Sequence, residues 1–258
     1  MNLRFISAKI TCVILLFAVA TTQAEEFRIE SEILFGDSKE PVSENLTLFS
    51  NGVVYDFMLT GSKEIAIFDA ARERFVLLDP ARKKKLTLTS DVIIQFVTKL
   101  RVHEFQKKAP FFFDPEFDET FDEEENLLTL ASPRMTYKVK GIKPEDPSAV
   151  VQYRKFADWY SRLNATIPGS MPPFPRLKMN EVLAEKGLIP ERVELTITPK
   201  KRLVQKQLEV TSRHLIIWQL SNRDREQIEK ANTYQATFEA VSFEDYRQQT
   251  SVASNGKN

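Results

Sequence analysis

Residues 26–88 alternate apolar and polar positions in short runs, a pattern of period two that predicts half-buried β-strands. The first run begins at Phe27. Asn51-Gly52 separates two of the following runs and predicts a type I′ hairpin, because both turn positions need positive φ angles. The remaining runs lie at 64–68, 75–78 and 84–88. Short turns leave no room for crossover helices, so we expect an antiparallel meander of about six strands.

The predicted turn also fixes which residues of the hairpin share a face. Ser50 opposes Val53, and successive pairs follow outward from them. One face is then apolar, and the other, with Thr47 and Asp56, is more polar. The apolar face is made of Leu46, Leu48, Val53, Tyr55 and Phe57.

Helical periodicity replaces alternation in later segments. The expected helices span 90–108, with an apolar stripe of Val92, Phe96 and Leu100, then 147–163, then 177–186 after a proline-rich linker, and a last one capped by Ser221. Further strands are expected within 116–140 and at 192–198, 203–211, 215–220 and 236–243.

This order of elements predicts an α+β fold. We expect a curved antiparallel β-sheet or half-barrel of about ten strands, with about four helices covering one face. Residues 25–246 would form a single globular domain, and 247–258 a polar, disordered tail.

The first 24 residues predict a secretory signal peptide that is cleaved on export. Arg4 and Lys9 precede an apolar run at 10–20, and Thr22-Gln23-Ala24 has the small-x-small pattern of a cleavage site. Cleavage would remove Cys12, the only cysteine. We therefore expect an exported protein of a bacterial periplasm or exterior, held together by its core without disulfides.

Charge and hydropathy limit the classes of partner that we expect. Lys plus Arg and Asp plus Glu number 36 each, so no basic excess suggests nucleic acid. No second apolar run approaches the roughly 18 to 20 residues of a spanning helix, so no integral membrane span is expected after cleavage. The oligomeric state is not predicted.

The sequence offers few groups for catalysis. The exported part would have no thiol and only two histidines, His103 and His214, and it has no Gly-x-Ser-x-Gly or His-Glu-x-x-His motif. With seven glycines it builds no phosphate-binding loop. We expect no enzyme activity, no cofactor and no catalytic residues, although a carboxylate pair acting on envelope glycans stays a less favoured alternative.

The acidic segment 114–125 allows two interpretations. Its acids match several positions of a calcium loop, but Glu119 stands where that loop needs glycine, and Pro115 is out of place. The favoured interpretation is a hairpin with Phe117 and Phe121 inward and the acids at its turn. No metal site is therefore predicted.

Nineteen phenylalanines and long apolar strand faces suggest an interior that either encloses a hydrophobic ligand or packs as a dry core. The candidate ligand-binding residues are Leu46, Leu48, Tyr55, Phe57, Ile67, Trp159 and Tyr160.

Residues 64–69 (EIAIFD), 74–80 (RFVLLDP) and 86–88 (LTL) resemble the strand-turn-strand passages of the periplasmic carriers and receptors of outer-membrane lipoproteins. The resemblance implies an unclosed β-barrel with helices over its mouth that holds acyl chains. Those carriers usually open with a helix, whereas here the first strand follows the cleavage site.

The leading hypothesis is an exported, non-enzymatic binding protein for a hydrophobic or envelope-derived ligand, with a lipoprotein as one such partner. The alternative is an interaction or scaffold module of the envelope that works through its outer surface.

Overall fold

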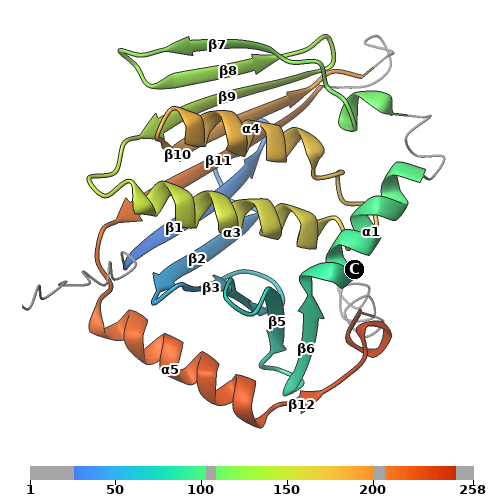
Figure 1. Cartoon of the computed structure of the whole chain (residues 1–258), viewed down its shortest axis with the longest axis vertical. Helices are drawn as coiled ribbons and strands as arrows, with labels where there is room; N and C mark the ends of the chain where they lie inside the picture. Colours follow the sequence, from blue (N-terminus) through green and yellow to red (C-terminus); the bar gives the residue numbers. More distant parts are fainter. Residues whose placement is uncertain (1–25, 103–108, 200–206, 248–258) are drawn as a thin grey trace, which may run out of the picture.

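A computed structural model describes residues 26–102, 109–199 and 207–247. Their strands form one curved, unclosed sheet of twelve strands in the order β12-β6-β5-β4-β3-β2-β1-β11-β10-β9-β8-β7 (Figure 1). The strands are β1 (Phe27–Phe35), β2 (Ser43–Ser50), β3 (Val53–Met58), β4 (Ile65–Asp69), β5 (Arg74–Asp79), β6 (Lys84–Thr89), β7 (Asp118–Asp122), β8 (Leu127–Ala131), β9 (Met135–Ile142), β10 (Ile189–Ile197), β11 (Leu208–Ile217) and β12 (Glu239–Ala240). The helices are α1 (Ser90–Val102), the 3₁₀ turn η1 (Pro110–Phe112), α3 (Ser148–Asn164), α4 (Phe174–Glu185) and α5 (Asn222–Thr237).

The predicted α+β fold with a curved sheet is confirmed, and so is the opening meander. Ser50 pairs with Val53, and Leu48 with Tyr55, as the Asn-Gly turn predicted. Asn51 has a φ of 52°, the left-handed conformation that a type I′ turn requires.

The two halves of the chain join through the pairing of β1 with β11, which places residues almost two hundred positions apart side by side. Two predicted strands, 203–211 and 215–220, are one strand in the structure, β11, as far as the described residues show. His214 therefore lies within a strand and not at its boundary. β12 is only two residues long and pairs in parallel with β6, so the sheet is mixed.

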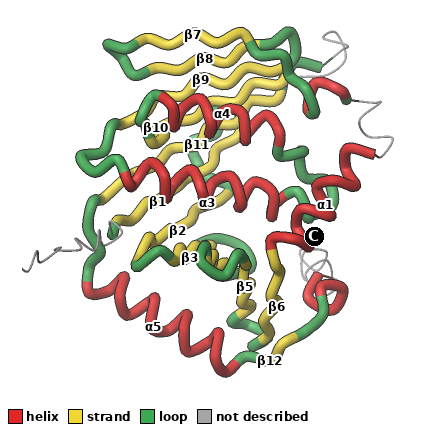
Figure 2. The backbone as a smooth tube through the Cα atoms, in the orientation of Figure 1, coloured by secondary structure: helices red, strands yellow, loops and turns green. Residues whose placement is uncertain are grey.

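The helices occupy both faces of the sheet, whereas the sequence predicted helices on one face. Figure 2 shows α3 and α4 side by side over β1, β10 and β11, with α5 apart from them, below β3. α3 belongs to a core cluster with Phe49 and Phe68, and α5 packs against the opposite side of the same strands, on Leu48 and Ile67. We call these the inner and the outer face.

The reason for the second layer lies in the strands themselves. All five residues of β4 are buried, as are four of the six residues of β3 and of β5. A strand that is apolar on both faces must be covered on both. The alternation that suggests a half-buried strand is therefore weakest in β4.

α1 differs from the prediction in its buried stripe. Ile93 and Val97 are the buried residues, while Val92 of the predicted stripe is 38% exposed. The expected extension to residue 108 lies outside the described residues, as do the proposed signal peptide and all but the first residue of the proposed tail. Across the described parts of the chain, no helix is long and apolar enough to cross a membrane.

Candidate functional site

The seven residues proposed for ligand binding are divided between the two faces of the sheet. Leu46, Leu48, Tyr55, Phe57 and Ile67 lie on the outer face, in one cluster with residues of α5. The Tyr55 hydroxyl donates a hydrogen bond of 3.1 Å to the side-chain oxygen of Asn232 in α5. This group packs a helix onto the sheet.

Trp159 and Tyr160 lie on α3 and pack against the inner-face cluster. The Tyr160 hydroxyl donates a hydrogen bond of 2.8 Å to Asp56 Oδ2. Thr47 and Asn45 of β2 also donate to this carboxyl, at 2.7 Å and 2.8 Å. Asp56 is 4% exposed, and burial raises the pKa of its carboxyl. This buried network joins α3 to the sheet.

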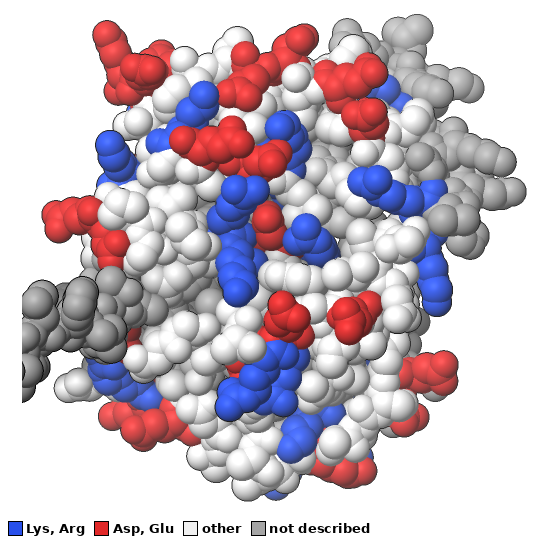
Figure 3. All heavy atoms as spheres, viewed as in Figure 1, with Lys and Arg blue, Asp and Glu red and all other residues white. Residues whose placement is uncertain are grey.

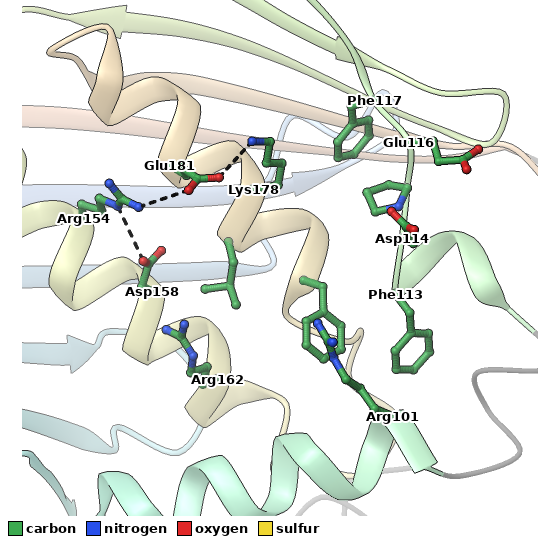
Figure 4. Close-up of a pocket in the computed structure, with 13 residues that line it drawn as sticks. Arg101, Phe113, Asp114, Glu116, Phe117, Arg154, Asp158, Arg162, Lys178 and Glu181 are labelled. Atoms are coloured by element: carbon green, nitrogen blue, oxygen red, sulfur yellow. Dashed lines mark hydrogen bonds and ion pairs between the residues drawn. The ribbon is translucent and has the colours of Figure 1, made fainter.

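A cleft of about 510 Å³ opens between α1, α3, α4 and the chain that follows η1 (Figure 4). Its volume falls in the range of small-molecule sites, roughly 300–1,000 Å³. None of the seven proposed residues lines it. Its lining is formed by Arg101, Phe113, Asp114, Pro115, Glu116, Phe117, Arg154, Asp158, Arg162, Phe174, Leu177, Lys178 and Glu181.

The apolar part of the cleft comes from two segments. Phe113 and Phe117 precede β7, and Phe174 and Leu177 belong to the first turn of α4. The rings of Phe113 and Phe174 lie 5.4 Å apart between centroids. Phe174 is the first residue of α4. Pro173 is the N-cap of this helix and Pro175 lies in its first turn, where the fixed φ of proline suits a helix. The prolines thus place an aromatic ring at the cleft.

Four charged side chains form a connected network along one wall. Lys178 Nζ lies 2.9 Å from a Glu181 carboxylate oxygen, and Arg154 lies 3.8 Å from both Glu181 and Asp158. The Asn180 side-chain amide donates to Asp158 at 2.9 Å. Figure 4 shows Arg154 between the two carboxylates. Burial raises the pKa of Asp158, despite the hydrogen bond from Asn180 and the nearby arginines.

Two other cations of the cleft stack on aromatic rings. The Arg101 guanidinium lies 4.2 Å from the centre of the Phe174 ring, and that of Arg162 lies 5.1 Å from the Trp159 ring. Burial lowers the pKa of Arg162. Across the described residues, neither arginine forms an ion pair.

The surroundings of His214 are those of a structural histidine. Its Nδ1 lies 2.8 Å from the Ser31 hydroxyl, and its Nε2 lies 3.1 Å from that of Ser212. Burial, aided by the charge of Arg176, lowers the pKa of the imidazole to about 3, so the ring is neutral at physiological pH. His103, the other histidine, lies outside the described residues.

The acidic segment forms the β7–β8 hairpin. Phe117 and Phe121 pack against a core cluster, and an oxygen of Asp122 accepts backbone hydrogen bonds from Glu124 and Glu125 in the turn. The described residues contain no group of three or more side chains suited to a metal ion. The hairpin interpretation is confirmed.

No known protein family matches the chain, and no curated protein matches it. The charged wall could have been suspected from the sequence, because Arg154, Asp158 and Arg162 follow one another at intervals of four on a predicted helix. Nothing local shows that α1 and the segment before β7 complete the cleft, since both are distant from α3 in the sequence.

Proposed function

We propose that this protein is a non-enzymatic binding protein and that its ligand has an apolar part held in the cleft of α1, α3 and α4. This keeps the class of function expected from the sequence, an exported carrier of a hydrophobic or envelope-derived molecule, and moves the site. The five outer-face residues belong to the cluster that packs α5 onto the sheet, and none of them lines the cleft.

The observation that carries the proposal is the composition of the cleft. Aromatic and aliphatic side chains from two segments face each other across it, and charged side chains line the rest. Binding sites for small molecules combine such apolar walls with a few polar groups that fix orientation. Figure 3 shows acidic and basic side chains intermingled over the face that carries α3 and α4. That face therefore lacks the continuous positive surface that a polyanionic partner would need.

Native mass spectrometry of the protein, purified without detergent, tests the proposal. We expect extra mass that organic extraction removes. Leu177→Trp, which fills the cleft, should abolish this mass. Val151→Trp, on a position of α3 that is 67% exposed, should retain it. A clean mass for the wild type, even after incubation with total lipid extract, would contradict the proposal and favour an interaction module that works through its surface.

One observation favours a second function, hydrolysis of envelope glycans by two carboxylates. Asp158 and Glu181 lie in the same cleft, and burial raises the pKa of Asp158, as a general acid requires.

The position of Arg154 counts against this second function. Its guanidinium lies 3.8 Å from an oxygen of each carboxyl group and favours the ionised form of Asp158, whereas a general acid must hold its proton. Incubation with purified envelope glycans decides the matter. Release of reducing ends that both Asp158→Asn and Glu181→Gln abolish, with folding intact, would establish the hydrolase.

A further inference from the structure

Arg162 is a half-buried cation at the cleft that forms no ion pair with the described residues, although the charge of the more distant Asp158 acts on it. Among the described residues, no carboxylate oxygen lies within the 4.0 Å of an ion pair, and its ring contact with Trp159 engages only one face of the guanidinium. The nearest acid along α3, Asp158, is bound by Asn180 and Arg154. A guanidinium has five donors, and none of those of Arg162 is both fully buried and without a partner, so they are open to water or to a ligand.

Arg101, whose side chain is exposed, supplies a second cation from another element. It reaches the cleft from α1, and Figure 4 shows it on the far side of the cleft from the paired network. It stacks on Phe174 and has no carboxylate partner within the described residues. Two cations from different helices thus face one cavity.

Among the described residues, the acids of the cleft form no ion pair with these two arginines. Glu181 is paired with Lys178 at 2.9 Å and shares Arg154 with Asp158. Asp114 and Glu116 are exposed to solvent, where water screens their charge. Two of the four acids that line the cleft are thus engaged by Lys178 and Arg154, and the other two lie in open solvent, which leaves the half-buried Arg162 as the cation best placed to bind an anion.

We propose that the ligand is an amphiphile with an anionic head group, a carboxylate or a phosphate, which Arg162 and Arg101 bind. This inference rests on the proposed function, because it assigns the ligand class of the same cleft. The planar guanidinium matches the two oxygens of either head group in a bidentate geometry. The apolar chain then contacts Phe113, Phe117 and Leu177, which line the same cavity.

Three amphiphiles of equal chain length test the inference by calorimetric titration below their micelle concentrations. Dodecanoate and dodecyl phosphate carry the two anionic head groups, and monododecanoylglycerol is the neutral probe. The full-length protein should bind at least one anionic probe about tenfold or more tighter than the neutral one, as expected for hydrogen bonds to a charged group. The comparison of the two anionic probes identifies which head group is preferred.

Variants of the protein test whether Arg162 and Arg101 bind the anionic head group. Arg162→Gln and Arg101→Gln should each weaken anionic binding about tenfold and weaken neutral binding much less, so that the selectivity for the anionic probe falls. Arg213→Gln, an exposed arginine on β11 that does not line the cleft, is the matched control and should change neither. Should Arg162→Gln unfold, Arg162→Lys keeps the charge and removes the planar fork, so reduced anionic selectivity is again expected.

The failures are distinguishable. If the neutral probe binds as tightly as the anionic ones, the cleft is a binding site and the anionic ligand class is wrong. If anionic selectivity survives both substitutions, the assignment to Arg162 and Arg101 is wrong. If no amphiphile binds, the proposed function itself fails.

Discussion

Asp56→Asn tests the claim that the inner face contains a buried carboxyl held by neutral donors. Oδ2 accepts from Asn45 and Tyr160, and Oδ1 accepts from Thr47. An asparagine can keep this geometry, with its carbonyl oxygen at the Oδ2 position and its amide donating to the Thr47 hydroxyl, which rotates to accept. The substitution therefore removes a titratable group and changes little else.

The sign of the effect follows from the pKa of Asp56. Burial raises this pKa above the ordinary value of about 3.9, so the folded state takes up the proton more readily than the unfolded chain. The contribution of Asp56 to stability is fully present below about pH 4 and is lost as the pH rises through the folded pKa. Asparagine does not titrate. Its stability relative to the wild type should therefore increase with pH by about 1.4 kcal/mol for each unit of pKa shift.

Urea denaturation of both proteins between about pH 4 and pH 8, at constant ionic strength, measures this difference in the free energy of unfolding. Asp146→Asn is the control with the opposite sign, because hydrogen bonds from Ser148 lower the pKa of the exposed Asp146. The stabilisation by Asp146 is lost only as the pH falls below the ordinary aspartate pKa of about 3.9, so the relative stability of Asp146→Asn should be nearly level between about pH 4 and pH 8 and should rise only at lower pH. A difference between Asp56→Asn and wild type that is independent of pH, or that decreases with pH, would refute the argument that desolvation dominates at Asp56.

Two further predictions concern local structure. Ser221→Ala removes the cap of α5, where the Ser221 hydroxyl accepts from the Asp224 backbone, and should lower the free energy of unfolding by about 1 kcal/mol in urea denaturation. An unchanged midpoint would contradict a role for the cap. Gly141→Ala places a Cβ 2.9 Å from Leu188 carbon atoms and should cost about 1–3 kcal/mol, whereas Lys138→Ala, exposed on the same strand, should cost much less. Equal midpoints for the two alanine variants would show that the close approach of Gly141 to Leu188 does not make a side chain at position 141 destabilising.

Sequence reasoning succeeded where a local rule fixes the geometry. The Asn51-Gly52 turn determined the register of β2 and β3, and with it the faces on which Leu48 and Asp56 lie. The Ser221 cap correctly began α5. Both rules act over a few residues, so they can be applied to the sequence without knowledge of the tertiary contacts.

Prediction was weaker where packing between distant segments decides. The stripe of α1 was displaced by one position, because the helix buries Ile93 and Val97 against a core that the helix sequence does not specify. The placement of α5 on the outer face follows from β4, whose five residues are all buried. A strand apolar on both faces calls for two layers, and recognising this would have corrected the single layer expected from the sequence.

The cleft that we propose as the binding site was not selected from the sequence. The predicted ligand residues were chosen for apolar character, and apolar strand faces such as Leu48 and Ile67 are what a sheet buries under a helix. The cleft instead combines phenylalanines with arginines that a packed core would exclude. Such a mixture is costly unless water or a ligand reaches it, so aromatic and half-buried cationic side chains that converge from separate segments indicate a candidate binding surface better than hydrophobicity alone. In this chain that argument selects Arg162 and Phe113, which come from segments about fifty residues apart and meet only in the folded structure.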